Sequence, residues 1–178
     1  MKHPATQLEI LEALESNARS IVEFFSGLPE RHFFDGDPEH WGPAHHLRHL
    51  TEASISVERA LRSKTLPLHP AGLSRTYPEV RDAATASLEA TPKDRLLEMG
   101  RTVVIPAGSR QRDVVEAFMA ASAALRDAAT TWTEHAMDRH ALPHPLMGRL
   151  TVREMLLFFV VHERHHLKIV RTRLEARS

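Results

Sequence analysis

Four long segments of this chain repeat their apolar residues with the period of an α-helix. They span about residues 6–25, 43–62, 109–134 and 151–176. In each segment apolar side chains recur three and four residues apart, which gathers them on one face of a helix. Glycines and prolines separate the segments, and alternation typical of strands is nearly absent. The pattern therefore predicts an all-α fold, a four-helix bundle.

The connection between the second and third long segments is itself long. About 45 residues separate them, too many for a tight turn between antiparallel neighbours. Residues 65–78 hold three prolines and are expected to form a loop, whereas residues 79–88 and 92–99 look like short helices. Residues 102–105 are apolar and β-branched and could be extended. We expect a long crossover connection here, and a further loop at residues 139–148.

Length and composition narrow the class of protein. A chain of 178 residues fits one domain, which we place at 1–178. The 23 basic and 23 acidic residues balance, so charge favours neither nucleic acid nor an anionic membrane as a partner. No apolar run approaches the roughly 20 residues that span a bilayer. The first 15 residues lack the apolar core of a signal peptide, so we expect a cytoplasmic protein.

The chain contains 13 histidines and no cysteine, so any metal site must use nitrogen and oxygen ligands. His162 and His166 lie four residues apart on the apolar stripe of the last segment, which directs both rings into the bundle. Two neutral imidazoles on one face form half of a transition-metal site. The alternative is a pair of buried histidines, each of which would need its own hydrogen-bond partner in a low-dielectric core.

The second long segment offers three candidates for a further ligand. His45, His46 and His49 are helical neighbours, and small side chains after His49 leave room for a site. His45 and His46 fall near the predicted helix start, where we expect them close to solvent or at a pocket rim. On spacing alone, His49 as a third ligand and three scattered polar histidines are about equally good interpretations.

Two motifs carry a resemblance to a known family. The sequence Trp41-Gly-Pro-Ala-His-His-Leu-Arg-His49-Leu resembles the start of the second helix in DinB-like proteins. Pro145-Leu-Met-Gly-Arg-Leu-Thr151-Val-Arg-Glu154, followed by His162-Glu-Arg-His-His166-Leu, resembles their last helix. There a loop and a threonine cap lead into His-x-x-x-His, and Thr151 with Glu154 has the spacing of a capping box. Helix order and length agree along the whole chain.

The resemblance implies a four-helix bundle with a long crossover between the second and third helices. It also implies a divalent metal held by one histidine of the second helix and two of the last, here His49, His162 and His166. The family includes hydrolase-like metal-dependent proteins and transferases or isomerases that use a low-molecular-weight thiol. His45, His46 and His165 are additional to this three-ligand pattern.

A metal held by three neutral imidazoles would acidify a bound water or bind a substrate thiol as thiolate. Zn or Ni are the expected ions, with Fe or Mn as alternatives, and an external thiol would be needed because the chain has none. Glu52 and His165 are weak candidates for proton transfer. Glu163 points about 100° away from His162 and is expected to be solvated. The open positions would face one end of the bundle, near Trp41 and residues 142–147.

Two classes of function follow. The first is a metal-dependent enzyme, a hydrolase or a thiol-dependent transferase, that acts on a small molecule. The second is a non-catalytic bundle that binds a metal or a small molecule, such as a stress-response protein. A homodimer is compatible with either class, although no sequence feature specifies it.

Overall fold

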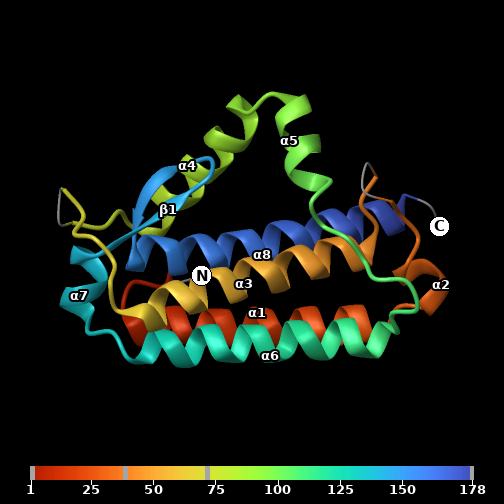
Figure 1. The fold of residues 1–178 in the computed structure, drawn as a ribbon, viewed down its shortest axis with the longest axis horizontal. Coiled ribbons are helices and arrows are strands. Elements are labelled where there is room, and N and C mark those ends of the chain that lie inside the picture. The colour runs from red at the N-terminus through yellow and green to blue at the C-terminus, as the bar shows by residue number, and fades with distance from the viewer. Residues whose placement is uncertain (1–2, 38–39, 71–72, 177–178) are drawn as a thin grey trace.

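The four long apolar segments form the four helices of a bundle in a computed structural model that describes residues 3–37, 40–70 and 73–176. These are α1 (Gln7–Ser26), α3 (Pro43–Ser63), α6 (Gln111–Thr130) and α8 (Val152–Glu175). They run side by side along the molecule (Figure 1). The predicted all-α four-helix bundle is confirmed.

The directions of the helices explain why the connection between α3 and α6 is long. At the start of α6, the side-chain amide of Gln111 donates to the carbonyl of Phe25 at the end of α1, so these helices are antiparallel. Just after α6, the indole of Trp132 donates to the carbonyl of Leu61 near the end of α3. α3 and α6 therefore run in the same direction. The chain must return along the full length of the bundle to join them, which confirms the predicted crossover.

The crossover rises above α8 as an arch (Figure 1) made of α4 (Tyr77–Ala90) and α5 (Lys93–Gly100). α4 packs on α8, where Arg164 donates to the Tyr77 hydroxyl at 3.2 Å. α5 contains no buried residue. Two hydrogen bonds hold it: the Trp41 indole donates to the Gly100 carbonyl at 3.2 Å, and the Arg95 side chain donates to the Pro145 carbonyl at 3.2 Å. Residues 102–105 belong to no described strand.

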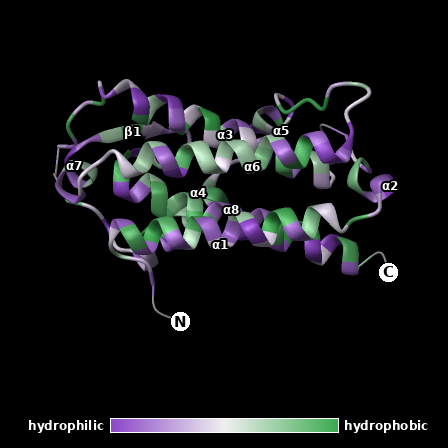
Figure 2. Cartoon of the chain, turned by 90° about the horizontal axis from the view of Figure 1, so that it is seen from below, coloured by the Kyte–Doolittle hydropathy of each residue, from purple (hydrophilic) through white to green (hydrophobic). Residues whose placement is uncertain are grey.

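Large apolar side chains fill the bundle along its length. Leu14, Phe118 and Phe159 have 2% or less of their surface exposed. Burying side chains of this size contributes about 1.5–3 kcal/mol each, before the entropy of ordering them. Figure 2 shows hydrophobic and hydrophilic residues alternating around the bundle helices, as expected where one face is buried. Within the described residues, no helix is both long enough and apolar enough to cross a membrane.

The region predicted as a loop at residues 139–148 is instead mostly a hairpin. Strands β1 (Ala141–His144) and β2 (Gly148–Thr151) pair in antiparallel register, with His144 opposite Gly148. Nδ1 of His144 accepts hydrogen bonds from the backbone amides of Leu146 and Met147, which closes the turn. Gly148 has a φ of 73°, a conformation that side chains with a Cβ rarely adopt. Neither strand alternates between buried and exposed residues, so a search for period-two alternation does not reveal them.

Two short helices were also absent from the predicted pattern. They are α2 (Glu30–Phe33) and α7 (Glu134–Arg139). The third long helix ends at Thr130 rather than near residue 134, because Thr133 caps a new helix by accepting from the amide of Ala136. The last helix begins as predicted: the Thr151 hydroxyl accepts from the Glu154 amide and the Glu154 carboxylate accepts from the Thr151 amide.

Candidate metal centre

Three imidazole rings from two helices meet between α3 and α8. Nε2 of His162 lies 3.0 Å from Nε2 of His49 and 2.9 Å from Nε2 of His166. The three ligand atoms all fall within 4.8 Å of one another, and the group could hold a metal ion. The structure thus brings together the three histidines that the sequence and the family resemblance selected. Their role as ligands stays a prediction.

The local sequence explains why these rings converge. The four-residue spacing of His162 and His166 places their rings on one face of α8, with centroids 4.5 Å apart and planes nearly perpendicular. On α3, His49 precedes the fully buried Leu50, so its ring lies at the edge of the inward face. The ring of His49 meets those of His162 and His166 at 4.9 Å each.

Burial keeps these histidines neutral. It lowers the pKa of His49 to about 4. It also holds the pKa values of His162 and His166 well below their usual range, and the neighbouring imidazoles add to this effect. A neutral imidazole has a free lone pair, which is the form that binds a metal. At neutral pH the cluster therefore presents three nitrogen donors without first losing a proton.

Two of the three donor separations are close to those of a tetrahedral site. Nitrogen atoms around a tetrahedral ion at the usual Zn–N length are roughly 3.3 Å apart. The two shortest separations here, 3.0 and 2.9 Å, need to open by only a few tenths of an ångström. Nδ1 of His162 is buried without a hydrogen-bond partner among the described residues, so no hydrogen bond to that atom holds the ring in place. The residues present fit a divalent ion.

Aromatic side chains from the loop before α3 and from α8 itself flank the histidines. The indole of Trp41 lies 5.2 Å from the His49 ring and 6.3 Å from the His166 ring. Phe158 stacks on His162 at 4.9 Å and is itself contacted by His144 of the hairpin. The cluster, however, lies near the middle of α8 rather than at one end of the bundle. The predicted neighbours do adjoin the cluster: Trp41 contacts the histidine rings, and His144 of the hairpin contacts Phe158. The direction in which open coordination positions face stays a prediction.

His45 and His46 are buried, with 6% and 4% of their surface exposed, so the prediction that they lie close to solvent is wrong. The segment before α3 folds back onto its start, where a Cβ on Gly42 would fall 2.0 Å from the carbonyl oxygen of Asp35. Trp41 then covers the ring of His46 at 5.3 Å. The three-residue spacing between His46 and His49 is the sequence signal that could have placed His46 in the cluster.

The predicted proton-transfer candidates lie outside the three-histidine group. Glu52 forms an ion pair with Arg48 at 2.7 Å on the half-exposed side of α3. His165 is exposed on α8, and its ring meets the edge of His166 at 5.6 Å. Partial burial lowers the pKa of His165, so it too is neutral near pH 7.

Glu163 is buried, with 1% of its surface exposed, so the prediction that it is solvated is wrong. The side-chain amide of Asn17 donates to its carboxyl group at 3.2 Å. Burial raises the pKa of Glu163 to about 8, although Asn17 and two arginines oppose this shift. The physical reason is that α8 packs against α1 as well as α3. The face of α8 that lies about 100° around the helix from His162 is therefore also interior.

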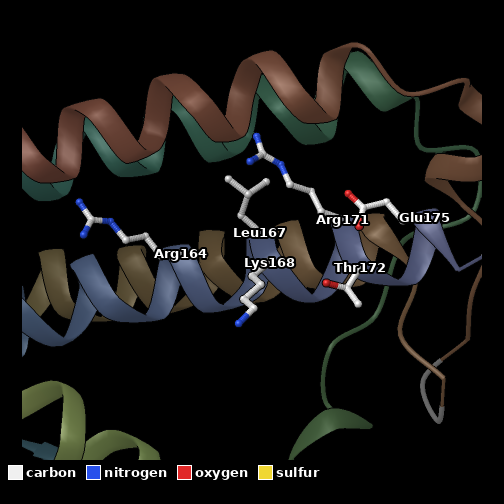
Figure 3. Close-up of a pocket in the computed structure, with 6 residues that line it drawn as sticks. All are labelled: Arg164, Leu167, Lys168, Arg171, Thr172 and Glu175. Atoms are coloured by element: carbon white, nitrogen blue, oxygen red, sulfur yellow. The ribbon is translucent and has the colours of Figure 1, made fainter.

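A separate hollow of about 360 Å³ lies along α8 on its α1 side. Figure 3 shows Arg164 and Arg171 pointing towards α1, whereas Lys168 points away. Arg164 donates to the Asn17 side chain and Arg171 covers the ring of Phe24. The hollow contains no histidine, and its arginines already serve packing, so we place the candidate site at the histidine cluster.

These features define a class: a four-helix bundle in which the second and last long helices bring three histidines together. A family model described as the DinB superfamily matches residues 13–170. The chain belongs to the DinB superfamily, and this confirms the resemblance found in its motifs.

A comparison with solved structures supports the same fold. The chain is similar to the structure titled "Crystal structure of TT2238, a four-helix bundle protein", with a TM-score of 0.60 and 20% sequence identity. The match covers 94% of this chain and 99% of that chain. A search of curated proteins found no match. Membership of the superfamily and the three-histidine group are both compatible with a metal-binding protein.

Proposed function

We propose that this protein is a divalent-metal-dependent enzyme in which His49, His162 and His166 hold the ion and a small molecule is the substrate. The observation that carries the proposal is that one ring nitrogen from each histidine lies within 4.8 Å of the others. Three protein ligands with a remaining open position are typical of catalytic rather than structural sites. Membership of the DinB superfamily supports this interpretation.

The chain's own residues supply the ligands and the walls of the site. The three imidazoles are neutral and keep the full charge of the ion, which lowers the pKa of any water or thiol that it binds. Trp41 and Phe158 lie beside the rings and exclude water from part of their surroundings. Imidazole ligands suit Zn, Ni and Fe, so we propose Zn or Ni, with Fe or Mn as alternatives.

Few side chains near the three histidines could transfer a proton to or from a substrate. Among the described residues, no carboxylate forms a hydrogen bond with any of the three rings. Glu52 is held by Arg48, which makes it the weaker candidate. His165 is exposed beside His166 and could exchange protons with solvent at the edge of the site. We propose His165 as the better of the two.

Metal analysis tests the ligand assignment. The purified chain, reconstituted separately with Zn, Ni, Fe and Mn salts, should hold close to one ion. His49→Ala and His162→Ala should each lose it, whereas His32→Ala, at an exposed position in α2, should not. A wild-type chain that takes up none of these ions would overturn the proposal. Full occupancy in His49→Ala would show that the third ligand is misassigned.

The reaction class needs a second experiment. Hydrolysis requires no further reactant, but thiol transfer needs an external thiol because the chain contains no cysteine. The metal-loaded protein should therefore be assayed on esters, amides and electrophilic small molecules with and without a low-molecular-weight thiol. Activity only with the thiol assigns a transferase. Metal uptake without any turnover would favour the non-catalytic alternative.

The homodimer and the cytoplasmic location stay predictions. Gel filtration tests the first and cell fractionation tests the second.

A further inference from the structure

His166 has a hydrogen-bond partner for the ring nitrogen that does not face the other two histidines. Its Nδ1 lies 2.7 Å from Nδ1 of His46, whereas Nδ1 of His162 is buried with no partner among the described residues. Histidines that bind metals usually donate their second ring N–H to an acceptor, which fixes the tautomer and the ring orientation. His46 lies where such an acceptor is needed.

We infer that His46 is a positioning residue for His166: its Nδ1 accepts the Nδ1–H of His166 and thereby leaves the Nε2 lone pair of His166 facing His49 and His162. This inference rests on the proposed function. It assigns a role to a histidine that lies outside the three-ligand pattern of the superfamily.

The short distance requires one ring to donate and the other to accept. Both rings are almost fully buried, with 4% of His46 and 8% of His166 exposed, and two ring nitrogens 2.7 Å apart need one N–H and one lone pair between them. If His46 donated, the proton of His166 would lie on Nε2, between the ligands, and would block metal binding. If His46 accepts, all three Nε2 atoms can present lone pairs. Only the second arrangement is compatible with a three-nitrogen site.

The surroundings of His46 support a role beyond packing. Its Nε2 is buried and has no hydrogen-bond partner among the described residues. Leaving a buried polar atom unpaired is destabilising, and an apolar side chain at this position would avoid that cost. The contact with His166 is the one polar side-chain contact that the described residues provide for His46. Unpaired buried groups of this kind call for a functional explanation.

Neighbouring groups hold the pair in place. The indole of Trp41 packs nearly perpendicular to His46 and stacks at 29° on His166, so one side chain restrains both rings. The backbone amide of His46 donates to the carbonyl of Gly42 in the first turn of α3. His46 therefore lies in the first turn of α3 rather than in a loop.

Zinc affinity tests the inference with matched variants. His46→Phe keeps an aromatic ring but removes the acceptor, whereas His46→Asn can place a side-chain oxygen near the position of Nδ1. His165→Phe is the control, because His165 contacts the His166 ring without a hydrogen bond between their nitrogens. Affinity for Zn²⁺ alone, measured against a chromophoric chelator, should fall about 10–100-fold in His46→Phe. It should be largely restored in His46→Asn and unchanged in His165→Phe.

A second measurement does not depend on metal loading. In the metal-free wild type, ¹⁵N-edited NMR of the histidine rings should show His166 protonated at Nδ1 and His46 at Nε2. In His46→Phe the His166 proton should move partly or wholly to Nε2. Because the wild-type spectrum alone reports the direction of the bond, the inference can be tested even if His46→Phe does not fold.

The outcomes separate the two proposals. If His49→Ala loses zinc but His46→Phe binds it like the wild type, the metal site stands and the role of His46 is overturned. If the wild type binds no metal, the proposed function fails, and the NMR spectrum decides the direction of the bond. A wild-type His166 protonated at Nε2 overturns the inference in either case.

Discussion

The Glu163 carboxyl group accepts a hydrogen bond from the Asn17 side-chain amide at 3.2 Å inside the bundle, one residue along α8 from His162. Consecutive residues of α8 thus face two different interiors. His162 meets His49 of α3, whereas Glu163 meets α1. Asn17 also donates to the carbonyl of Val160 and accepts from Arg164, so its side chain contacts three residues of α8. α8 is restrained on its α1 side as well as at the histidines.

Replacing Glu163 by glutamine should change how stability depends on pH. The pKa of Glu163 is raised from 4.5 to about 8, so the folded chain holds this proton more tightly than the unfolded chain. The stability that this tighter proton binding gives to the folded chain is present in full below pH 4.5. It is lost as pH rises towards 8, by up to about 1.4 kcal/mol per pH unit. Glu163→Gln cannot ionise and escapes this loss. Urea unfolding at pH 5, 6, 7 and 8 should show the variant gaining stability relative to the wild type.

The histidines do not obscure that comparison, because both proteins contain the same ones and their effects cancel in the difference. Parallel stability curves for wild type and Glu163→Gln over this range would show that Glu163 is already ionised in the folded chain. The pKa of a buried group would then be set by Arg126 and Arg164 rather than by desolvation.

Metal binding should raise the melting temperature. An ion that binds only the folded chain contributes about 2.7 kcal/mol at 100 times its Kd, or roughly 5–10 °C for a domain of this size. Scanning calorimetry at pH 7.5 with Zn²⁺ should show this rise, and a chelator should reverse it. His166→Ala should melt at the same temperature with and without Zn²⁺, while His32→Ala behaves as the wild type. A comparable rise in His166→Ala would place the zinc elsewhere.

Trp41 should anchor α5 over the histidines. Its indole donates to the Gly100 carbonyl at 3.2 Å, and α5 has no buried residue of its own. Trp41→Phe removes this bond, worth about 1 kcal/mol, so amides of residues 93–101 should exchange with deuterium about fivefold faster. Mass spectrometry of the exchanged peptides measures this.

Trp132→Phe is the matched control for that experiment, because it also removes one indole hydrogen bond of 3.2 Å, to Leu61. It should leave exchange in α5 unchanged relative to the rest of the chain. If both variants alter α5 equally, α5 is held by the overall stability of the bundle and not by Trp41.

The cap of α8 should matter more than that of α1. Thr151 is fully buried, caps α8 and lies 2.7 Å from the hydroxyl of Ser74, whereas the equivalent Thr6 of α1 is exposed. Thr151→Ala should cost about 2 kcal/mol, near the top of the range for such caps, and lower the melting temperature by roughly 4–8 °C. Thr6→Ala should cost about 1 kcal/mol or less. Equal shifts in circular-dichroism melts would contradict this ranking.

The sequence by itself determined the four bundle helices, the crossover and the three histidines that meet. These depend on local regularities: apolar residues recur with the helical period, and the spacing of His162 and His166 places two rings on one face whatever the helix packs against. The capping box of Thr151 and Glu154 is equally local, since both groups lie within one turn. Selecting His49 from its neighbours needed the family motif, because spacing treats His45, His46 and His49 alike.

Only the tertiary structure decided which faces of a helix are interior. Glu163 is buried and His46 touches His166 because α1 and the segment around Trp41 pack on faces that periodicity leaves open to solvent. The hairpin of residues 141–151 likewise depends on the cross-strand pairing of β1 with β2. Periodicity along one helix identifies its most apolar face, but burial of a polar side chain depends on neighbours far away in the sequence.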